Sequence, residues 1–498
     1  MEITKMDLFR ILQGRKKGLL LTFIAFSIFA NAQLVTYPEG LKAGMQHNDD
    51  YTVRVRVPGG EWKDLFEYNV SVDMDNVHSA SMVQFDMGSP VEVMVKKNNG
   101  TIHEVDIRPQ VNDIRYVQYK NVITFMLDKP RYLSVEFNGD RLHNLHVFAN
   151  PMETETYSKE EKGVMYFGPG VHRPKDLPNN QIRIPSNTTV YLAPGAVVKA
   201  KLWVDKAENV RIVGRGILDH PIRGIEITDS KNVVVDGITV INPDHYTVFG
   251  GGAVGVTIRN LKSFSCKGWS DGIDMMCCHD VLIDNVFMRN SDDCIALYNH
   301  RWNWWGGSDN ITVQNSILWA DIAHPINVGG HGDPESLTGE TIENLIFRNI
   351  DILEHDEDDV PYQGCMAIDA GDRNRVKNIL FEDIRVESIQ EGKLFHINIR
   401  FNPKYDKQPG QSIDGVTFRN IIIVNRAKMD QIAADCPAAH LPPDILEISG
   451  FAVVSYVIIA GTHRDRTDFH TFISKAAIDH LVDGTITAAA IDPQPGSL

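Results

Sequence analysis

The chain has 498 residues, of which 43% are hydrophobic, and it carries a formal net charge of −16 at pH 7. This length and composition suffice for two or three domains with buried cores and exclude a chain that is disordered throughout. The excess of acidic residues makes the protein a poor non-specific partner for nucleic acid, so we expect no nucleic-acid binding.

The first 32 residues are predicted to be a signal peptide. Basic residues at 15–17 precede an apolar run over 18–29, and residues 30–32 are Ala-Asn-Ala, the small-x-small pattern of a cleavage site. The apolar run is short for a membrane span, which needs ~20 residues. We therefore expect a secreted or periplasmic protein that has no membrane span once the signal is cleaved.

Residues 33–155 are predicted to form an antiparallel β-sandwich domain. Apolar and polar residues alternate in short runs such as 51–57, 91–95 and 132–137, and Gly-containing turns follow them. This pattern is typical of half-buried strands joined by tight turns. No catalytic constellation occurs in this segment, so we expect a structural or carbohydrate-contacting module.

Residues 156–427 carry a repeated strand motif that ends in Asn or Asp before an apolar residue, with a period that grows from 24 to 37 residues. Stacked coils that are lengthened by loop insertions produce such a period, and short β-branched strands favour a parallel β-helix. Asn at a turn tolerates left-handed backbone and can hydrogen-bond to the equivalent residue one coil away. The marker residues of the repeat are Asp236, Asn260, Asn285, Asn315, Asn349, Asp383 and Asn420.

Residues 428–498 form an atypical C-terminal segment that does not continue the repeat. Residues 451–460 are a strand candidate, and residues 472–482 place their apolar side chains on one helical face. We expect this segment to cap the open end of the β-helix, which otherwise exposes strand edges.

Six cysteines occur in a chain that is predicted to be exported, where disulfides are permitted. The run Cys278-His279-Asp280 has residue types that bind metals, but no second Cys/His pair at zinc-finger spacing accompanies it. Core packing or a disulfide is the favoured interpretation. We expect no metal and no cofactor.

Three acidic residues and a histidine recur at similar places on three successive coils. Counted from the marker of its coil, Asp271 lies 11 residues on, Asp292 and Asp293 lie 7 and 8 residues on, and His324 lies 9 residues on. Such offsets stack the side chains on one face, where neighbouring carboxylates raise at least one pKa, as a general acid requires. Two alternatives are ordinary acidic turn residues and a Ca²⁺ site, although no calcium-binding nonapeptide repeat is present.

The surrounding motifs resemble the active site of the polygalacturonase (glycoside hydrolase family 28) and dextranase (family 49) clan. Trp-Ser-Asp-Gly-Ile-Asp at 269–274 resembles the Asn-Thr-Asp-Gly-x-Asp of polygalacturonases, and Asp-Asp-Cys at 292–294 matches theirs. Their Gly-His-Gly-x-Ser-Ile-Gly best matches residues 323–329, while the literal Gly-His331-Gly lies seven residues out of register. The resemblance implies a right-handed parallel β-helix, so the predicted fold is all-β, with an antiparallel β-sandwich before that helix.

The dextranase family resembles more of the chain, from about residue 50 to 425, because it also has a β-sandwich before the β-helix. The segments that carry this similarity lie at 133–137, 147–151, 166–171, 191–199 and 394–398.

The resemblance also implies roles for individual residues. Asp292 would be the general acid that protonates the glycosidic oxygen, and Asp271 and Asp293 would hold and deprotonate the attacking water of an inverting reaction. His324 would orient or tune the acid, and Asp274 would contact the substrate. An inverting pair of carboxyl groups typically lies ~6.5–9.5 Å apart.

One polygalacturonase hallmark is absent from the sequence. The Arg-Ile-Lys strand that binds a uronate carboxylate is replaced by Met-Ala-Ile-Asp at 366–369. The loss of both cations favours a neutral, dextranase-like glycan over pectin.

A tryptophan-rich insert follows the Asp pair, with the sequence His-Arg-Trp-Asn-Trp-Trp-Gly-Gly at 300–307. Three exposed tryptophans in one loop usually mark a binding surface, and sugar rings stack on such side chains. We therefore predict that Arg301, Trp302, Trp304 and Trp305 contact substrate. Packing of the tryptophans over the edge of the β-helix is the alternative.

The sequence thus predicts a monomeric, exported glycoside hydrolase that cleaves O-glycosidic bonds within a polysaccharide by an inverting, two-carboxylate mechanism. Alternatives are a polygalacturonase-type pectin hydrolase, a β-helix polysaccharide lyase and a non-catalytic carbohydrate-binding or adhesion solenoid. The lyase is disfavoured because it needs a Ca²⁺-bound uronate and an Arg or Lys base, and no such base is evident.

Overall fold

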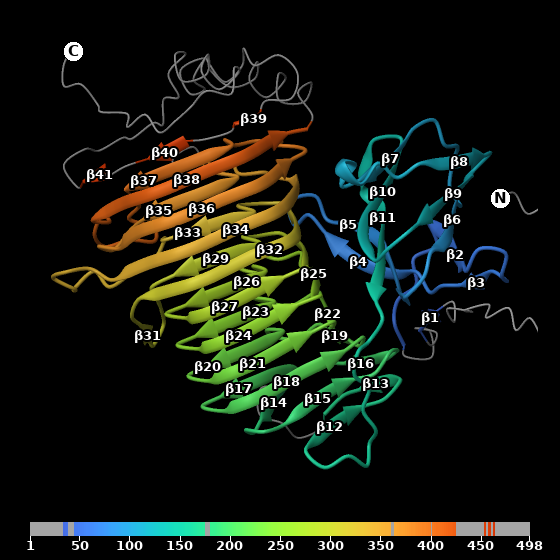
Figure 1. Ribbon diagram of the computed structural model, residues 1–498, viewed down its shortest axis with the longest axis horizontal. Helices are drawn as coiled ribbons and strands as arrows, with labels where there is room; N and C mark the ends of the chain where they lie inside the picture. Colours follow the sequence, from blue (N-terminus) through green and yellow to red (C-terminus); the bar gives the residue numbers. More distant parts are fainter. Residues whose placement is uncertain are drawn as a thin grey trace, which may run out of the picture.

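The computed structural model shows a tall parallel β-helix with a smaller β-sandwich beside it (Figure 1). It describes residues 33–37, 44–174, 180–359, 363–399 and 401–424, together with three short strands between 453 and 463. The predicted signal peptide at 1–32, Cys436 and the predicted helix at 472–482 lie outside the described residues. The predicted all-β fold, a β-sandwich followed by a right-handed parallel β-helix, is confirmed.

The β-sandwich consists of a six-stranded and a five-stranded sheet. The first has the order β1-β5-β11-β10-β7 with β4 beside β5, and the second has the order β3-β2-β6-β9-β8. One pair, β5 with β11, is parallel, which the antiparallel prediction did not include. The elements are β1 (Leu34–Thr36), β2 (Tyr51–Arg56), β3 (Lys63–Asp64), β4 (Tyr68–Val72), β5 (His78–Met87), β6 (Val91–Lys97), β7 (Val105–Arg108), the 3-10 helix η2 (Gln110–Asn112), β8 (Tyr116–Tyr119), β9 (Val122–Leu127), β10 (Arg131–Phe137) and β11 (Asp140–Pro151).

The β-helix consists of a 19-stranded sheet and a 9-stranded sheet. The larger sheet contains β12 (Val164–Phe167), β13 (Gly170–His172), β15 (Thr189–Leu192), β16 (Ala196–Val198), β18 (Glu208–Gly214), β19 (Ile217–Asp219), β21 (Lys231–Asp236), β22 (Thr239–Ile241), β24 (Val254–Arg259), β25 (Lys262–Phe264), β27 (His279–Asp284), β28 (Phe287–Asn290), β32 (Ser308–Ala320), β34 (Thr341–Glu354), β36 (Arg375–Val386), β38 (Ser412–Ile423), β39 (Val453–Val454), β40 (Val457–Ile459) and β41 (Thr462–His463). The smaller sheet contains β14 (Gln181–Ile184), β17 (Lys201–Asp205), β20 (Ile225–Thr228), β23 (Val248–Gly251), β26 (Ile273–Met276), β29 (Ile295–Tyr298), β33 (Ile326–Val328), β35 (Met366–Ala370) and β37 (Phe395–Ile399).

In-register stacking of apolar residues builds the core of the β-helix. The rings of Phe347, Phe381 and Phe418 stack on three successive coils, with centroids 4.9 Å apart at each step. Each coil alone exposes its apolar side chains, and the next coil buries them, so the core grows only as coils are added.

The Asn positions of the repeat form the predicted ladder. Asn260, Asn285 and Asn315 have φ values of 54°, 53° and 54°, in the left-handed region that Asn tolerates. The Asn285 side-chain amide donates a 2.7 Å hydrogen bond to Asn260 Oδ1, and Asn349 repeats this contact with Asn315 at 2.8 Å. These turns therefore hold successive coils in register on the outer edge of the β-helix.

The six-stranded sheet of the sandwich packs its outer face on the β-helix. An apolar cluster joins Tyr68, Met82 and Phe148 of the sandwich to Phe264 and Trp319 of the β-helix. Arg108 on β7 crosses the same junction and forms ion pairs with Glu136, Glu354 and Glu387 at 3.1, 2.8 and 2.7 Å. The sandwich is therefore fastened to the β-helix by buried apolar and ionic contacts.

At the far end of the β-helix, β39, β40 and β41 pair antiparallel with β38, the strand of the last coil. This pairing covers the edge of β38, where the sequence predicted a cap (Figure 1).

The five cysteines in the described part of the chain, Cys266, Cys277, Cys278, Cys294 and Cys365, are all free thiols. Among the described residues, no helix combines the length and apolarity that a membrane span requires.

Candidate active site

Three of the predicted catalytic residues occupy one position of the coil on successive turns. Ile273, Ile295 and Ile326 pair in register as the first residues of β26, β29 and β33. Asp271, Asp293 and His324 each precede one of these isoleucines by two residues, where the chain enters the 9-stranded sheet, and Asp292 adjoins Asp293. The register of the β-helix thus stacks these side chains along one corner.

The carboxyl groups meet at a cavity of about 620 Å³. One oxygen each from Asp271, Asp292 and Asp293 lies within 4.8 Å of the others. The acids are therefore a compact three-carboxyl cluster rather than two groups that face each other across a cleft.

Asp293 is the ionised member of the cluster. Its Oδ1 accepts hydrogen bonds from the backbone and Nδ1 of His324 at 3.1 and 2.6 Å, and its Oδ2 accepts them from Asn327 Nδ2 at 2.7 Å and the Tyr298 hydroxyl at 3.1 Å. Burial alone would raise the Asp293 pKa, but the charge and hydrogen bonds of His324 lower it below its usual value. The roughly four lone-pair sites of this carboxylate are all used.

Asp292 is half-buried and opens onto the cavity. Burial, followed by the adjacent charge of Asp293, raises the Asp292 pKa to about 6. Two backbone N–H groups partly oppose this rise, because Trp269 donates to Oδ2 at 2.8 Å and Asp293 donates to Oδ1 at 3.0 Å. Asp292 can therefore carry a proton at mildly acidic pH and deliver it to a bound molecule.

Asp271 and Asp274 are the most protonated acids of the group. Burial and then the neighbouring carboxylates raise both pKa values well above the usual value. Asp271 lines the cavity, and its Oδ1 has no hydrogen-bond partner among the described residues. Asp274, predicted to contact substrate, is instead fully buried and lies outside the cavity lining, so it meets the cluster from behind, beside Asp271.

His324 is completely buried and is held between two acids. Its Nδ1 faces Asp293 at 2.6 Å, and its Nε2 lies 4.0 Å from Glu357 Oε2. Burial alone would lower the His324 pKa, but Asp293 raises it to about 9. At neutral pH this side chain is an imidazolium that holds Asp293 ionised.

The second candidate histidine, His331, lines the opposite part of the cavity. Its ring lies 4.9 Å from that of Tyr298 and 6.2 Å from that of Tyr405, and its Nε2 is 3.3 Å from Arg301 Nη1. The structure thus brings His324 to the acids and places His331 beside the predicted substrate contact Arg301.

The tryptophan insert folds into a hairpin, β30 (His300–Arg301) and β31 (Trp304–Trp305). None of its tryptophans lines the acidic cavity. Trp302 is 39% exposed and lies 5.9 Å from the Tyr246 ring, which does line the cavity. Trp304 packs on Phe249 at 5.1 Å, in line with the packing alternative.

Trp305 is 51% exposed and stacks on His300. Of the three tryptophans, Trp302 alone is thus exposed and packed against a residue that lines the cavity.

The position expected to hold a uronate carboxylate is apolar and acidic. β35 (Met366–Ala370) is buried along its length, and Asp369 is fully buried with an Oδ1 that lies 3.1 Å from His396 Nδ1. Arg301 and Lys404 are the two Lys or Arg side chains that line the cavity, against six Asp and Glu side chains.

Several cavity residues were not singled out from the sequence. Trp269 and Tyr298 lie within or just after the matched motifs, and their aromatic character was the available signal. Met74, Glu357 and Tyr405 come from distant segments with no motif of their own. The ring centroids of Trp269 and Tyr405 lie 6.5 Å apart. Segments far apart in the sequence, from Met74 to Tyr405, therefore form the wall of the cavity.

Two groups of side chains in the described part of the chain could present three ligand atoms to a metal ion. One is the cluster of Asp271, Asp292 and Asp293, and the other combines His331 with Asp372 and Asp406. In the first group the lone pairs of Asp293 are already used by four donors, which makes it a poor cation ligand.

Comparison with known proteins gives a family and several distant relatives. The family model for glycosyl hydrolases family 28 matches residues 193–456, more than half of the chain. A probable endopolygalacturonase D of Neosartorya fischeri is 23% identical over 46% of this chain and 41% of its own length. A probable endo-xylogalacturonan hydrolase A of Aspergillus fumigatus is 23% identical over 46% of this chain and 55% of its own length.

The alignments therefore span less than two thirds of the length of these relatives. Among solved structures, Dex49A from Penicillium minioluteum is 16% identical with a TM-score of 0.48, over 77% of this chain and 89% of that one.

Proposed function

Because the chain belongs to glycosyl hydrolases family 28, we propose that it cleaves O-glycosidic bonds within a polysaccharide by acid–base catalysis. The observation that carries this proposal is the division of charge between two adjacent residues. Asp293 is held ionised by four hydrogen bonds, while the pKa of its neighbour Asp292 is raised to about 6. Environments that push neighbouring carboxyl pKa values apart are how sites of this kind assign an acid and a base.

Asp292 is the general acid of the proposed reaction. It is half-buried and opens onto the cavity, so its proton can reach a glycosidic oxygen. The two backbone N–H groups that bind its oxygens fix the direction of the carboxyl group.

Asp271 and Asp293 hold the attacking water in this proposal. Asp271 offers an oxygen without a protein partner, and Asp293 supplies the negative charge beside it. The cluster shares its protons among coupled groups, so the reacting form is the one in which Asp292 carries the proton and Asp271 is ionised. Asp271 then takes up the proton that the water releases, while Asp292 gives its own proton to the glycosidic oxygen. Asp293 does not attack the sugar, because its lone-pair sites already accept four hydrogen bonds. Water is then the nucleophile, and the anomeric configuration inverts.

His324 supports Asp293 rather than the substrate in this scheme. Its ring is completely buried and bonded to Asp293, and Asn327 and Tyr298 complete the shell around that carboxylate. Its positive charge also lowers the pKa of Asp292, which partly offsets the rise caused by burial.

The favoured substrate is a neutral glycan of the dextranase-like kind, whose backbone carries no charge. Among the described residues, the cavity lining carries six acidic side chains against two Lys or Arg side chains, and β35 itself has neither Lys nor Arg at 366–369. Trp302 and Trp269 offer exposed aromatic faces for sugar rings beside this cavity.

A pectin-type substrate is the second candidate. The printed names of the relatives, endopolygalacturonase and endo-xylogalacturonan hydrolase, favour it. Arg301 and Lys404 would then have to pair with the uronate carboxylates.

The test is a panel of dextran, pullulan, polygalacturonate and sulfated galactans, assayed for new reducing ends with the wild type and Asp292→Asn. We expect activity on a neutral glucan that is lost in the variant. Activity confined to polygalacturonate would transfer the proposal to pectin, and products with the absorbance of unsaturated uronates would identify a lyase. If no polymer is cut and Asp292→Asn leaves glycan binding unchanged, the protein is a non-catalytic binding solenoid.

A further inference from the structure

The β-sandwich sends one loop into the catalytic cavity. The turn at 73–77 joins β4 to β5, and Met74 in this turn lines the cavity together with Asp292 and Trp269. Met74 is half-buried, and its Sδ faces the side of Gly268, next to Trp269, where an added Cβ would lie 4.0 Å from it. A residue of the N-terminal sandwich therefore forms part of the wall around the general acid.

Two backbone hydrogen bonds fasten this loop to the β-helix. The Asp73 N–H donates to Asp321 Oδ2 at 3.1 Å, and the Met74 N–H donates to Ser291 Oγ at 3.1 Å. Ser291 is fully buried and directly precedes Asp292. The loop is thus attached to the same short turn that orients the acid.

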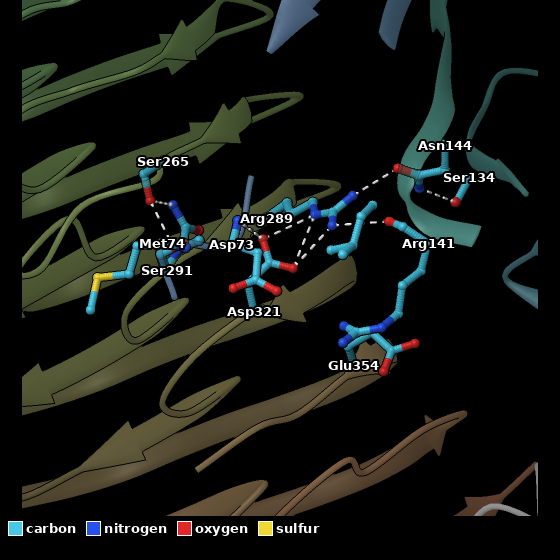
Figure 2. A network of polar contacts seen from close by, with 12 residues as sticks. Asp73, Met74, Ser134, Arg141, Asn144, Ser265, Arg289, Ser291, Asp321 and Glu354 are labelled. Atoms are coloured by element: carbon cyan, nitrogen blue, oxygen red, sulfur yellow. Dashed lines mark hydrogen bonds and ion pairs between the residues drawn. The ribbon is translucent and has the colours of Figure 1, made fainter. Parts of the chain in front are cut away.

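A buried ion pair fixes the far side of the attachment (Figure 2). Arg289 binds Asp321 at 3.0 Å, and neither side chain is exposed. The same guanidinium donates to Asn144 Oδ1 at 2.9 Å and to the Arg141 carbonyl at 3.1 Å, both on β11 of the sandwich. Asp321 therefore connects the body of the sandwich, the loop and the coil that carries the catalytic turn.

From these contacts we propose that the β4–β5 loop is a working part of the active site. In this proposal Met74 contacts the apolar face of the sugar bound beside Asp292, and Ser291 positions the acid through the loop. The Met side chain is flexible and polarisable, so it can adapt its shape to the apolar face of a sugar ring. The inference rests on the proposed glycoside hydrolase function and adds a substrate contact and a positioning residue that lie outside the matched motifs.

The contacts that join the sandwich to the β-helix elsewhere do not require Met74 to line the cavity. The apolar cluster around Phe148 and Trp319 already joins the two sheets, and the Arg108 ion pairs fasten them at a second point. The loop contacts are additional to these, and they end at the residue before the acid.

Steady-state kinetics of full-length Met74→Ala test the substrate contact. We expect KM to rise by about tenfold with kcat nearly unchanged, the lower end for losing an apolar contact in a substrate pocket. Met74→Leu should restore most of the affinity. The matched control is Met126→Ala, because Met126 is 43% exposed on β9 of the sandwich, away from the cavity lining. A KM for Met74→Ala equal to that of wild type, or an equal rise in Met126→Ala, overturns the contact.

Ser291→Ala tests the positioning role. We expect a lower kcat, a shifted alkaline limb of the pH profile and faster hydrogen exchange of the Met74 amide, which loses its acceptor. If wild-type protein cuts no glycan, the proposed function fails and the substrate contact of Met74 fails with it, while the exchange measurement still decides whether Ser291 holds the loop. Unchanged exchange at 73–77 and 291–293 in the variant would show that the loop is not held through Ser291.

Discussion

Two clusters of buried carboxylates in the described part of the chain, one at the domain junction and one in the catalytic cavity, differ in whether arginine side chains contact them. At the domain junction, Glu354 and Glu387 each meet the guanidinium of Arg108, and Asp321 meets that of Arg289. In the catalytic cavity, Asp271 and Asp292 have neighbouring carboxyls and no Lys or Arg within ion-pair distance among the described residues. At the junction each of these acids contacts an arginine, with Glu136, Glu354 and Glu387 sharing Arg108, whereas Asp271 and Asp292 in the cavity contact none that the structure describes.

The difference separates a role in stability from a role in chemistry. Paired buried charges are costly to break but do not need to change protonation. Crowded acids with few cations raise their pKa values into the range where proton transfer is useful. Asp293 links the two patterns, because His324 gives it the cationic partner that the other acids lack.

The largest effect is expected from removing the general acid. Asp292→Asn should lower kcat by about 10²–10⁴-fold, the range for losing general acid catalysis, with little change in the melting temperature. The single carboxamide oxygen can still accept the Asp293 N–H, while the Trp269 N–H loses its acceptor at this half-buried position. Reducing-end assays together with thermal unfolding check both parts, and a variant as active as wild type would remove Asp292 from the mechanism.

The opposite result is expected at the junction. Arg108→Met leaves Glu136, Glu354 and Glu387 buried without their cation, which should lower the free energy of unfolding by about 3–5 kcal/mol. The kcat of the folded fraction should stay near wild type. Arg54→Met is the matched control, because Arg54 is exposed and its pair with Asp64 contributes at most about 1 kcal/mol. Urea denaturation measures both, and equal stability of the two variants would contradict the contrast.

A smaller effect is a shift of the pH profile. Asp292 must be protonated to act, so kcat/KM should fall as the pH rises through about 6, the pKa of that carboxyl. His324 lowers this pKa through its charge, so His324→Gln should move the alkaline limb to higher pH while also lowering the rate. An alkaline limb that stays in place would show that the histidine charge does not reach the acid.

The smallest effect is expected outside the cavity. Trp302→Ala should lower kcat/KM on long chains by about 3- to 10-fold, the scale of one aromatic contact, and spare short oligosaccharides. Trp305→Ala is the control, because Trp305 is more exposed and packs on His300, away from Tyr246. Equal losses on short and long substrates would mean that Trp302 supports the fold rather than the glycan.

Most of the fold and the acid cluster could be predicted because the Asn and Asp residues that mark each coil recur along the sequence. Asp271, Asp293 and His324 are related by the same register that stacks the core, so their meeting followed from the spacing. Met74 and Tyr405 could not be found this way, since they reach the cavity by packing between segments far apart in sequence.

Asp274 shows a second limit of the sequence. It shares a motif with Asp271, but Asp274 lies within β26 and is fully buried, whereas Asp271 precedes that strand and lines the cavity, a difference that the motif does not reveal.

The most direct measurement of the central claim is the anomeric configuration of the first product, followed by NMR on a susceptible glycan. One oxygen each from Asp271, Asp292 and Asp293 lies within 4.8 Å of the others, so a carboxylate and a water compete for the position of the nucleophile. The hydrogen bonds that occupy Asp293 and the proton held by Asp292 predict that water attacks. The account predicts inversion in the first turnover, and a retained product would show that one of these carboxylates attacks the sugar itself.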